Sequence, residues 1–153
     1  MFTNSMKFLF YVSLYLLIIA ADIECFNITI TKRIDDSNAH TIGLLMDKRS
    51  QTNATILDAL NASSHRHPQE YRFTGIHFPS LGYYIQSIGQ LYENRHQNKY
   101  WFVYELDAKG EHRPTNGVSS HITNNTHYVF HYKTHKFDSK VDTNWISVTK
   151  SFA

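Results

Sequence analysis

Cysteine is almost absent from the sequence, which holds only Cys25 among its 153 residues. A disulfide within the chain is therefore excluded, and so are the small secreted families built on a disulfide framework. Acidic residues are also sparse, and no pair of them stands out for acid–base catalysis. The sequence lacks a glycine-rich phosphate loop, a Gly-Xaa-Ser-Xaa-Gly nucleophile elbow and a His-Glu-Xaa-Xaa-His zinc motif. We therefore expect a protein that is not an enzyme and that holds no covalently bound cofactor.

Charge of one sign is also scarce, because the formal net charge is only +2. A protein that binds the phosphate backbone or an anionic membrane surface normally concentrates many more basic residues. We therefore expect neither nucleic acid nor a membrane as a partner.

The longest apolar run covers residues 8–21 and is too short to cross a bilayer as a helix, which takes about 20 residues. It follows Lys7, and this pattern is typical of a signal peptide. We expect residues 1–25 to be the signal peptide, cleaved after Ala21 or Cys25, with an uncleaved anchor as the alternative. The exported chain would be extracellular, with one domain at 26–133 and a polar tail at 134–153 that is either an edge strand or a loose end.

Four Asn-Xaa-Ser/Thr sequons follow the predicted signal peptide, which agrees with secretion through a eukaryotic pathway. Glycans occur only on the protein surface. The expected glycosylation sites are Asn27, Asn53, Asn61 and Asn124.

The pattern of apolar residues indicates an α+β fold. Residues 26–32 alternate between apolar and polar and are rich in β-branched side chains, and residues 41–47 are expected to pair with them as a second strand. One helix is expected over residues 53–63, capped by Thr52 or Asn53. Further strands are expected at 71–78, 82–88, 100–106 and 128–132.

Aromatic side chains are concentrated in the second half of the sequence. In a strand, neighbouring residues face opposite sides. Tyr100, Phe102 and Tyr104 therefore share one face. Trp101 and Val103 share the other, and one of the two sets must face the core. The outward set is either ordinary packing or a platform for a flat ligand or a partner.

Ten histidines raise the question of a metal site. His127, His131 and His135 recur at every fourth position, which would place them on one face of a helix. The surrounding sequence is typical of a strand, however, in which residues 127 and 131 lie about 13 Å apart, too far for one ion. His65 and His67 fall in a segment expected to be a solvated loop. No metal site is therefore expected.

A series of short motifs carries a family resemblance. In order, the sequence contains ILDAL at 56–60, GYYIQSIG at 82–89, YWFVY at 100–104 and YVFHY at 128–132. Their order and spacing resemble the C-terminal β-domain of the cobalamin carriers transcobalamin and intrinsic factor, a module that is also found alone in secreted proteins. The resemblance covers about residues 26–133.

The resemblance implies a β-grasp-like small sheet with one packed helix, following the signal peptide, and a binding function for cobalamin or a related corrinoid. In the carriers this domain covers one side of the corrinoid, and a helical barrel domain holds the other side. About 130 residues leave no room for a barrel. A separate helical-barrel protein is therefore an expected partner.

Two segments are expected to contact the corrinoid, because a flat ring rimmed with amides suits aromatic side chains and exposed backbone groups. The expected ligand-binding residues are Tyr84, Gln86, Ser87, Ile88, Gly89, Tyr100, Trp101 and Phe102. The alternative is a secreted glycoprotein interaction module that kept the fold but not the cobalamin ligand.

Overall fold

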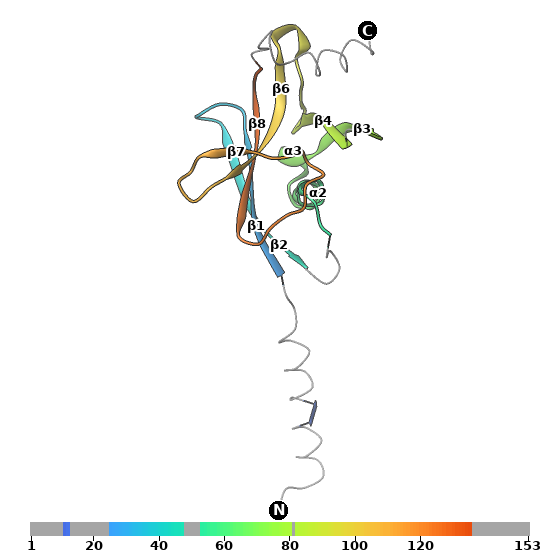
Figure 1. Cartoon of the computed structure of the whole chain (residues 1–153), viewed down its shortest axis with the longest axis vertical. Helices are drawn as coiled ribbons and strands as arrows, with labels where there is room; N and C mark the ends of the chain where they lie inside the picture. Colours follow the sequence, from blue (N-terminus) through green and yellow to red (C-terminus); the bar gives the residue numbers. More distant parts are fainter. Residues whose placement is uncertain (1–10, 13–24, 48–52, 81, 136–153) are drawn as a thin grey trace, which may run out of the picture.

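A computed structural model describes residues 11–12, 25–47, 53–80 and 82–135. Most of these residues form strands (Figure 1). The elements are β1 (Cys25–Arg33), β2 (Ala39–Asp47), α2 (Ile56–Arg66), α3 (Pro68–Tyr71), β3 (Phe73–Phe78), β4 (Gly82–Ile88), β5 (Leu91–Tyr92), the 3-10 helix η1 (Arg95–Gln97), β6 (Lys99–Leu106), β7 (His112–Pro114) and β8 (Thr126–Thr134).

The strands form two sheets. The larger has five strands in the order β2-β1-β8-β6-β7, and the smaller has three in the order β3-β4-β5. β1 and β8 run parallel, whereas the other neighbouring strands run antiparallel. Figure 1 shows α2, α3 and the small sheet on the same side of the large sheet. This side is called the inner face below, and the opposite side is called the outer face.

The core lies between the inner face and α2, as the alternation in the sequence predicts. Ile28 and Ile30 of β1 point inward and are almost completely buried, and Leu44 of β2 lies opposite Ile28 in the register. From the helix, Ile56 and Leu60 are fully buried against them. These positions are four residues apart, which places them on one face of α2.

The first helix begins later than the sequence predicts. Thr55, and not Thr52 or Asn53, caps α2, because its side chain accepts a hydrogen bond from the Asp58 backbone N–H and the Asp58 carboxylate accepts one from the Thr55 backbone. This reciprocal pair is a capping box. The four-residue helix α3 follows directly and begins at Pro68, where the missing N–H of proline carries no cost.

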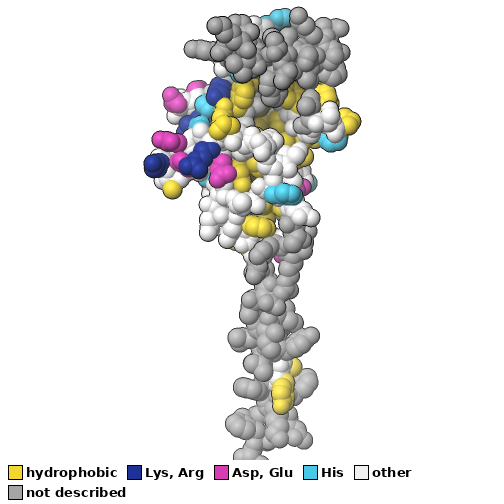
Figure 2. All heavy atoms as spheres, viewed as in Figure 1, with side chains coloured by type: hydrophobic (Ala, Val, Ile, Leu, Met, Phe, Trp, Pro, Cys, Tyr) yellow, Lys and Arg dark blue, Asp and Glu magenta, His cyan; other side chains and the backbone are white. Residues whose placement is uncertain are grey.

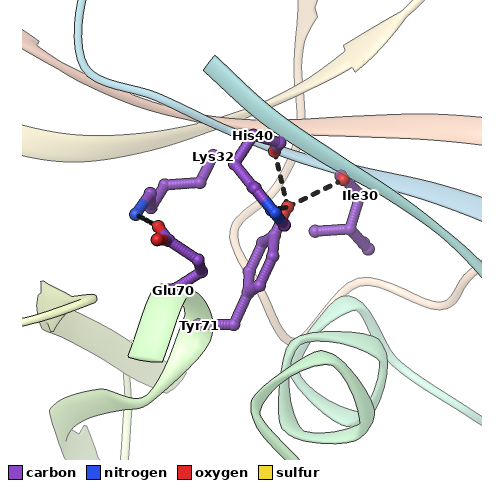
Figure 3. A network of polar contacts seen from close by, with 5 residues as sticks. All are labelled: Ile30, Lys32, His40, Glu70 and Tyr71. Carbon is purple, nitrogen blue, oxygen red and sulfur yellow. Dashed lines mark hydrogen bonds and ion pairs between the residues drawn. The ribbon is translucent and has the colours of Figure 1, made fainter. Parts of the chain in front are cut away.

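Polar contacts join α3 to β1 and β2 (Figure 3). The Tyr71 hydroxyl lies 3.2 Å from the carbonyl oxygen of Ile30 and 2.5 Å from that of His40. Burial raises the pKa of the Tyr71 phenol, which keeps its proton available as a donor. Lys32, buried on the inner face, forms an ion pair with Glu70. These contacts fix the position of α3 on the sheet.

The predicted fold class is wrong. The structure has two sheets and is predominantly β, whereas the prediction was an α+β, β-grasp-like fold with one small sheet and one packed helix. The physical reason lies in the strand pairing. β3 and β4 pair with each other and β6 pairs with β8 and β7, so the strands after α3 do not extend one common sheet. The predicted signal peptide lies outside the described residues apart from residues 11–12 and 25, and the predicted tail lies outside them beyond residue 135.

Candidate functional site

The motif GYYIQSIG forms β4 and the start of a tight turn into β5. Ile88 pairs with Leu91, so the turn between them has two residues. Gly89 and Gln90 both have positive φ angles, 58° and 67°. Positive φ at both central residues is the geometry of a type I′ hairpin, which follows the natural twist of the strands.

Hydrogen bonds fix this hairpin to the rest of the domain. The Gly89 backbone N–H donates to the carbonyl of Arg72 at 2.8 Å. The Trp101 indole N–H donates to the carbonyl of Leu91 at 3.0 Å, and the Tyr132 hydroxyl donates to the backbone of β5 at the same distance. The small sheet is therefore attached to β6 and β8 through buried aromatic side chains.

Three of the expected ligand-binding residues have side chains inside the fold. Ser87 is 2% exposed and shares a hydrogen bond of 2.7 Å with the hydroxyl of Thr74. Ile88 is fully buried, and Trp101 is 7% exposed. These side chains pack within the protein and are not available to a ligand in this conformation. Trp101 belongs to the set of β6 residues that faces the core.

Tyr84 and Gln86 alternate with the buried residues of β4 and lie half-buried on its other face. The Tyr84 hydroxyl donates to the carboxylate of Glu93, which also accepts a hydrogen bond of 2.8 Å from Arg95 Nε. Burial raises the pKa of the Tyr84 phenol, and the bond to Glu93 raises it further. The half-buried Tyr100 is close enough to add a smaller effect in the same direction.

The structure therefore divides the expected residues. We call Tyr84, Gln86 and Tyr100 the hairpin face, with the backbone of Gly89 at the turn beside it. Phe102 lies two residues further along the same side of β6 as Tyr100, on the outer face of the large sheet beside Tyr104 and His135.

Sequence reasoning missed several residues around the hairpin face. Glu93 accepts the hydrogen bond of the Tyr84 hydroxyl, and Arg95 forms an ion pair with Glu93. Both residues come from a polar stretch whose only signal in the sequence is their opposite charge. Ile76, opposite Tyr84 in the register, and Tyr92, opposite Ser87 and so on the other side of the small sheet, are large apolar residues with 41% and 60% exposure. Only the pairing of β3, β4 and β5 places them on the small sheet.

A hollow of about 570 Å³ lies elsewhere, at the end of β6. Its lining includes Asp107, Arg113 and His127 and none of the expected ligand-binding residues. Within the described ranges there is no group of three residues that could hold a metal ion. In the same ranges no helix is long and apolar enough to span a membrane. The four sequon asparagines Asn27, Asn53, Asn61 and Asn124 are all exposed.

No protein-family model matches the sequence, and no curated protein matches it either. Solved structures do match. The structure of haptocorrin in complex with cobinamide (Cbi) aligns over 74% of this chain with a TM-score of 0.62 and 16% sequence identity. The match covers 26% of the haptocorrin chain, so this chain corresponds to about a quarter of that protein.

A second match is a protein from Ruminococcus gnavus ATCC 29149 that is proposed to bind metal. It aligns over 72% of this chain and 99% of its own length, with a TM-score of 0.50 and 12% identity. At these identities the matches establish the fold alone. The chain has a transcobalamin-like fold, shared with part of haptocorrin.

Proposed function

We propose that this protein is a secreted, non-enzymatic binding module for a corrinoid, and that the hairpin face is its contact surface. The observation that carries the proposal is the shared fold with part of haptocorrin, whose structure holds cobinamide. The half-buried Tyr84, Gln86 and Tyr100 support it, because they are the expected ligand-binding side chains that remain partly accessible around the hairpin.

The chemistry of the hairpin face suits a flat ligand with amide groups. Tyrosine rings offer apolar surface with a polar edge, and the Gln86 amide both donates and accepts hydrogen bonds. The Glu93 carboxylate is already bonded to Tyr84 and Arg95, so it orients the phenol and does not present an unpaired charge. A neutral, mostly aromatic surface with a few fixed polar groups is typical of a small-molecule site.

A single face covers only one side of a corrinoid. Because the chain matches about a quarter of haptocorrin, we propose that a second chain, a helical-barrel protein, covers the other side. Binding to the module alone is then expected to be weak, since much of the ligand surface stays in water.

A second candidate is an extracellular interaction module that has no corrinoid ligand. The exposure of all four sequon asparagines favours it, because glycans at these sites would occupy a large part of the surface. The two candidates differ in one measurable property, which is whether the hairpin face takes up a corrinoid.

Titration of the purified full chain with cobinamide, followed by the corrinoid absorbance, tests the proposal. Gln86→Ala is expected to weaken binding about three- to tenfold, the effect of losing one hydrogen bond. The matched control is Leu45→Ala on the edge strand β2, which shortens an exposed side chain outside the hairpin face and is expected to leave binding unchanged. Absence of any spectral change at about 1 mM cobinamide would favour the second candidate.

A further inference from the structure

The outer face of the large sheet carries polar atoms that have no partner. Arg33, the last residue of β1, lies beside His131 of β8 in the parallel register. Both side chains project from the outer face, because their neighbours Lys32, Phe130 and Tyr132 are buried on the inner face. Arg33 Nε and His131 Nδ1 are buried, yet neither has a hydrogen-bond partner among the described residues.

Such atoms are unusual, because burying a polar atom without a hydrogen bond costs free energy. The basic side chains that do form ion pairs among the described residues are Lys32, Arg95 and Arg113. Arg33 is not one of them. Its guanidinium therefore has a charge and a buried donor that the described part of the fold does not neutralise.

Further basic groups surround this pair. The ring of His112, from β7, lies 6.0 Å from the ring of His131 and stacks on Tyr104 at 5.2 Å. Lys133 Nζ lies 4.7 Å from the centre of the Tyr104 ring, a cation–π contact and not an ion pair. His127 Nε2 is 2.7 Å from a threonine hydroxyl of β1. We call Arg33, His112, His127, His131 and Lys133 the outer-face cluster. In Figure 2, histidine and basic side chains lie at the left edge of the molecule, with acidic side chains among them.

Among the described residues, the charges that act on His131 come from β1, the loop after it, β7 and β8, and none comes from the adjacent strand β6. They are Arg33 from β1, Asp36 from the loop after it, His112 from β7 and Lys133 from β8 itself. Burial lowers the pKa of His131, and the positive charges of Lys133 and Arg33 lower it further. Asp36 acts in the opposite direction with the smallest effect. Burial likewise lowers the pKa of His112 and of His127.

We propose that the outer-face cluster is a binding site for a small anion with carboxylate or phosphate-type oxygens, held by Arg33 and His131. A guanidinium beside an unpaired imidazole nitrogen offers charged and directional donors, which is how proteins hold such anions. A bound anion favours protonated histidine, so binding takes up a proton and strengthens as the pH falls. Lys133 lies opposite Tyr100 in the register of β6 and β8, so this site adjoins the hairpin face, but it does not depend on the corrinoid proposal.

NMR titration of the histidine ring signals of the full chain tests the proposal. The probes are sodium sulfate, whose charge is constant in this pH range, and sodium acetate, each against sodium chloride at equal ionic strength. We expect saturable shifts of His131 and His112, with binding at least about fivefold tighter at about pH 5.5 than at about pH 8. A response to sulfate alone identifies a phosphate-type ligand, and a response to acetate identifies a carboxylate.

Matched variants separate a ligand site from a structural cluster. Arg33→Gln and His131→Gln are each expected to weaken sulfate binding about tenfold or more. The control is Arg113→Gln, which is expected to leave sulfate binding unchanged because Arg113 already forms an ion pair with Asp107. Without sulfate, Arg33→Gln is expected to unfold at the same or a higher urea concentration, because it removes a buried atom that has no partner. Shifts no larger than those with chloride, or unchanged sulfate affinity in Arg33→Gln, would overturn the proposal.

Discussion

Replacing Gly89 by alanine is expected to destabilise the protein by more than the cost of a positive φ angle, because the added Cβ also clashes with neighbouring atoms. Gly89 has a φ of 58°, and a Cβ there would lie 2.6 Å from the carbonyl oxygen of Glu70 and 2.9 Å from Lys32 Nζ. The left-handed conformation costs alanine about 1–2 kcal/mol. Overpacking adds about 1–3 kcal/mol, since the nearest atom belongs to the backbone and cannot rotate away. The free energy of unfolding should therefore fall by about 2–5 kcal/mol.

The chain offers a matched control at Gly110. This residue has a φ of 81°, but no atom lies within 4 Å of a Cβ placed there. Gly110→Ala should therefore show only the conformational cost, about 1–2 kcal/mol. Any stabilisation that alanine brings by restricting the unfolded chain is common to both variants and cancels in the comparison. Urea unfolding of the two variants gives the difference, and equal losses would refute the close contact between the hairpin turn and α3.

Other substitutions test the remaining contacts. Trp101→Phe removes the indole N–H that donates to β5, and should lower the free energy of unfolding by about 1–3 kcal/mol, measured by urea unfolding. An unchanged free energy of unfolding would show that this hydrogen bond does not stabilise the protein. Tyr71→Phe leaves buried backbone carbonyls without their donor and should cost a similar amount, visible as a lower Tm. The hydrogen bond from Lys32 lowers the pKa of Glu70, so the ionised Glu70 stabilises the folded protein above about pH 4.5, and this stabilisation is lost as the pH falls. In Glu70→Gln, the free energy of unfolding should therefore depend less on pH between about pH 5 and pH 3. Burial lowers the pKa of His131, so stability should also fall with pH below about 6.5, and an unchanged slope there in His131→Gln would contradict this.

The sequence predicts individual strands well because their signal is local. Ile28 and Ile30 alternate with threonines, and this alternation alone identifies β1 and its buried face. The pairing between β1 and β2 follows from the short polar break between them. The division into two sheets could not be predicted in this way, because it depends on contacts between segments far apart in the chain.

The candidate site shows the same limit at the level of side chains. Alternation predicts that Gln86 and Ser87 face opposite sides of β4, but it does not indicate which side meets the core. Ser87 points inward because Thr74 of β3 supplies a hydrogen-bond partner there. The partner of Tyr84, Glu93, lies beyond the turn at Gly89 and becomes a neighbour only when that turn forms.

The parallel pairing of β1 with β8 has a consequence for biosynthesis. β1 and β2 are made before the other strands and can form a hairpin at once, but the other edge of β1 keeps its hydrogen-bonding groups open until residues 126–134 are made. Open strand edges attract other chains, and pairing between distant segments slows folding. We therefore expect the nascent hairpin to be most prone to pairing with other chains in the interval before β8 has been made.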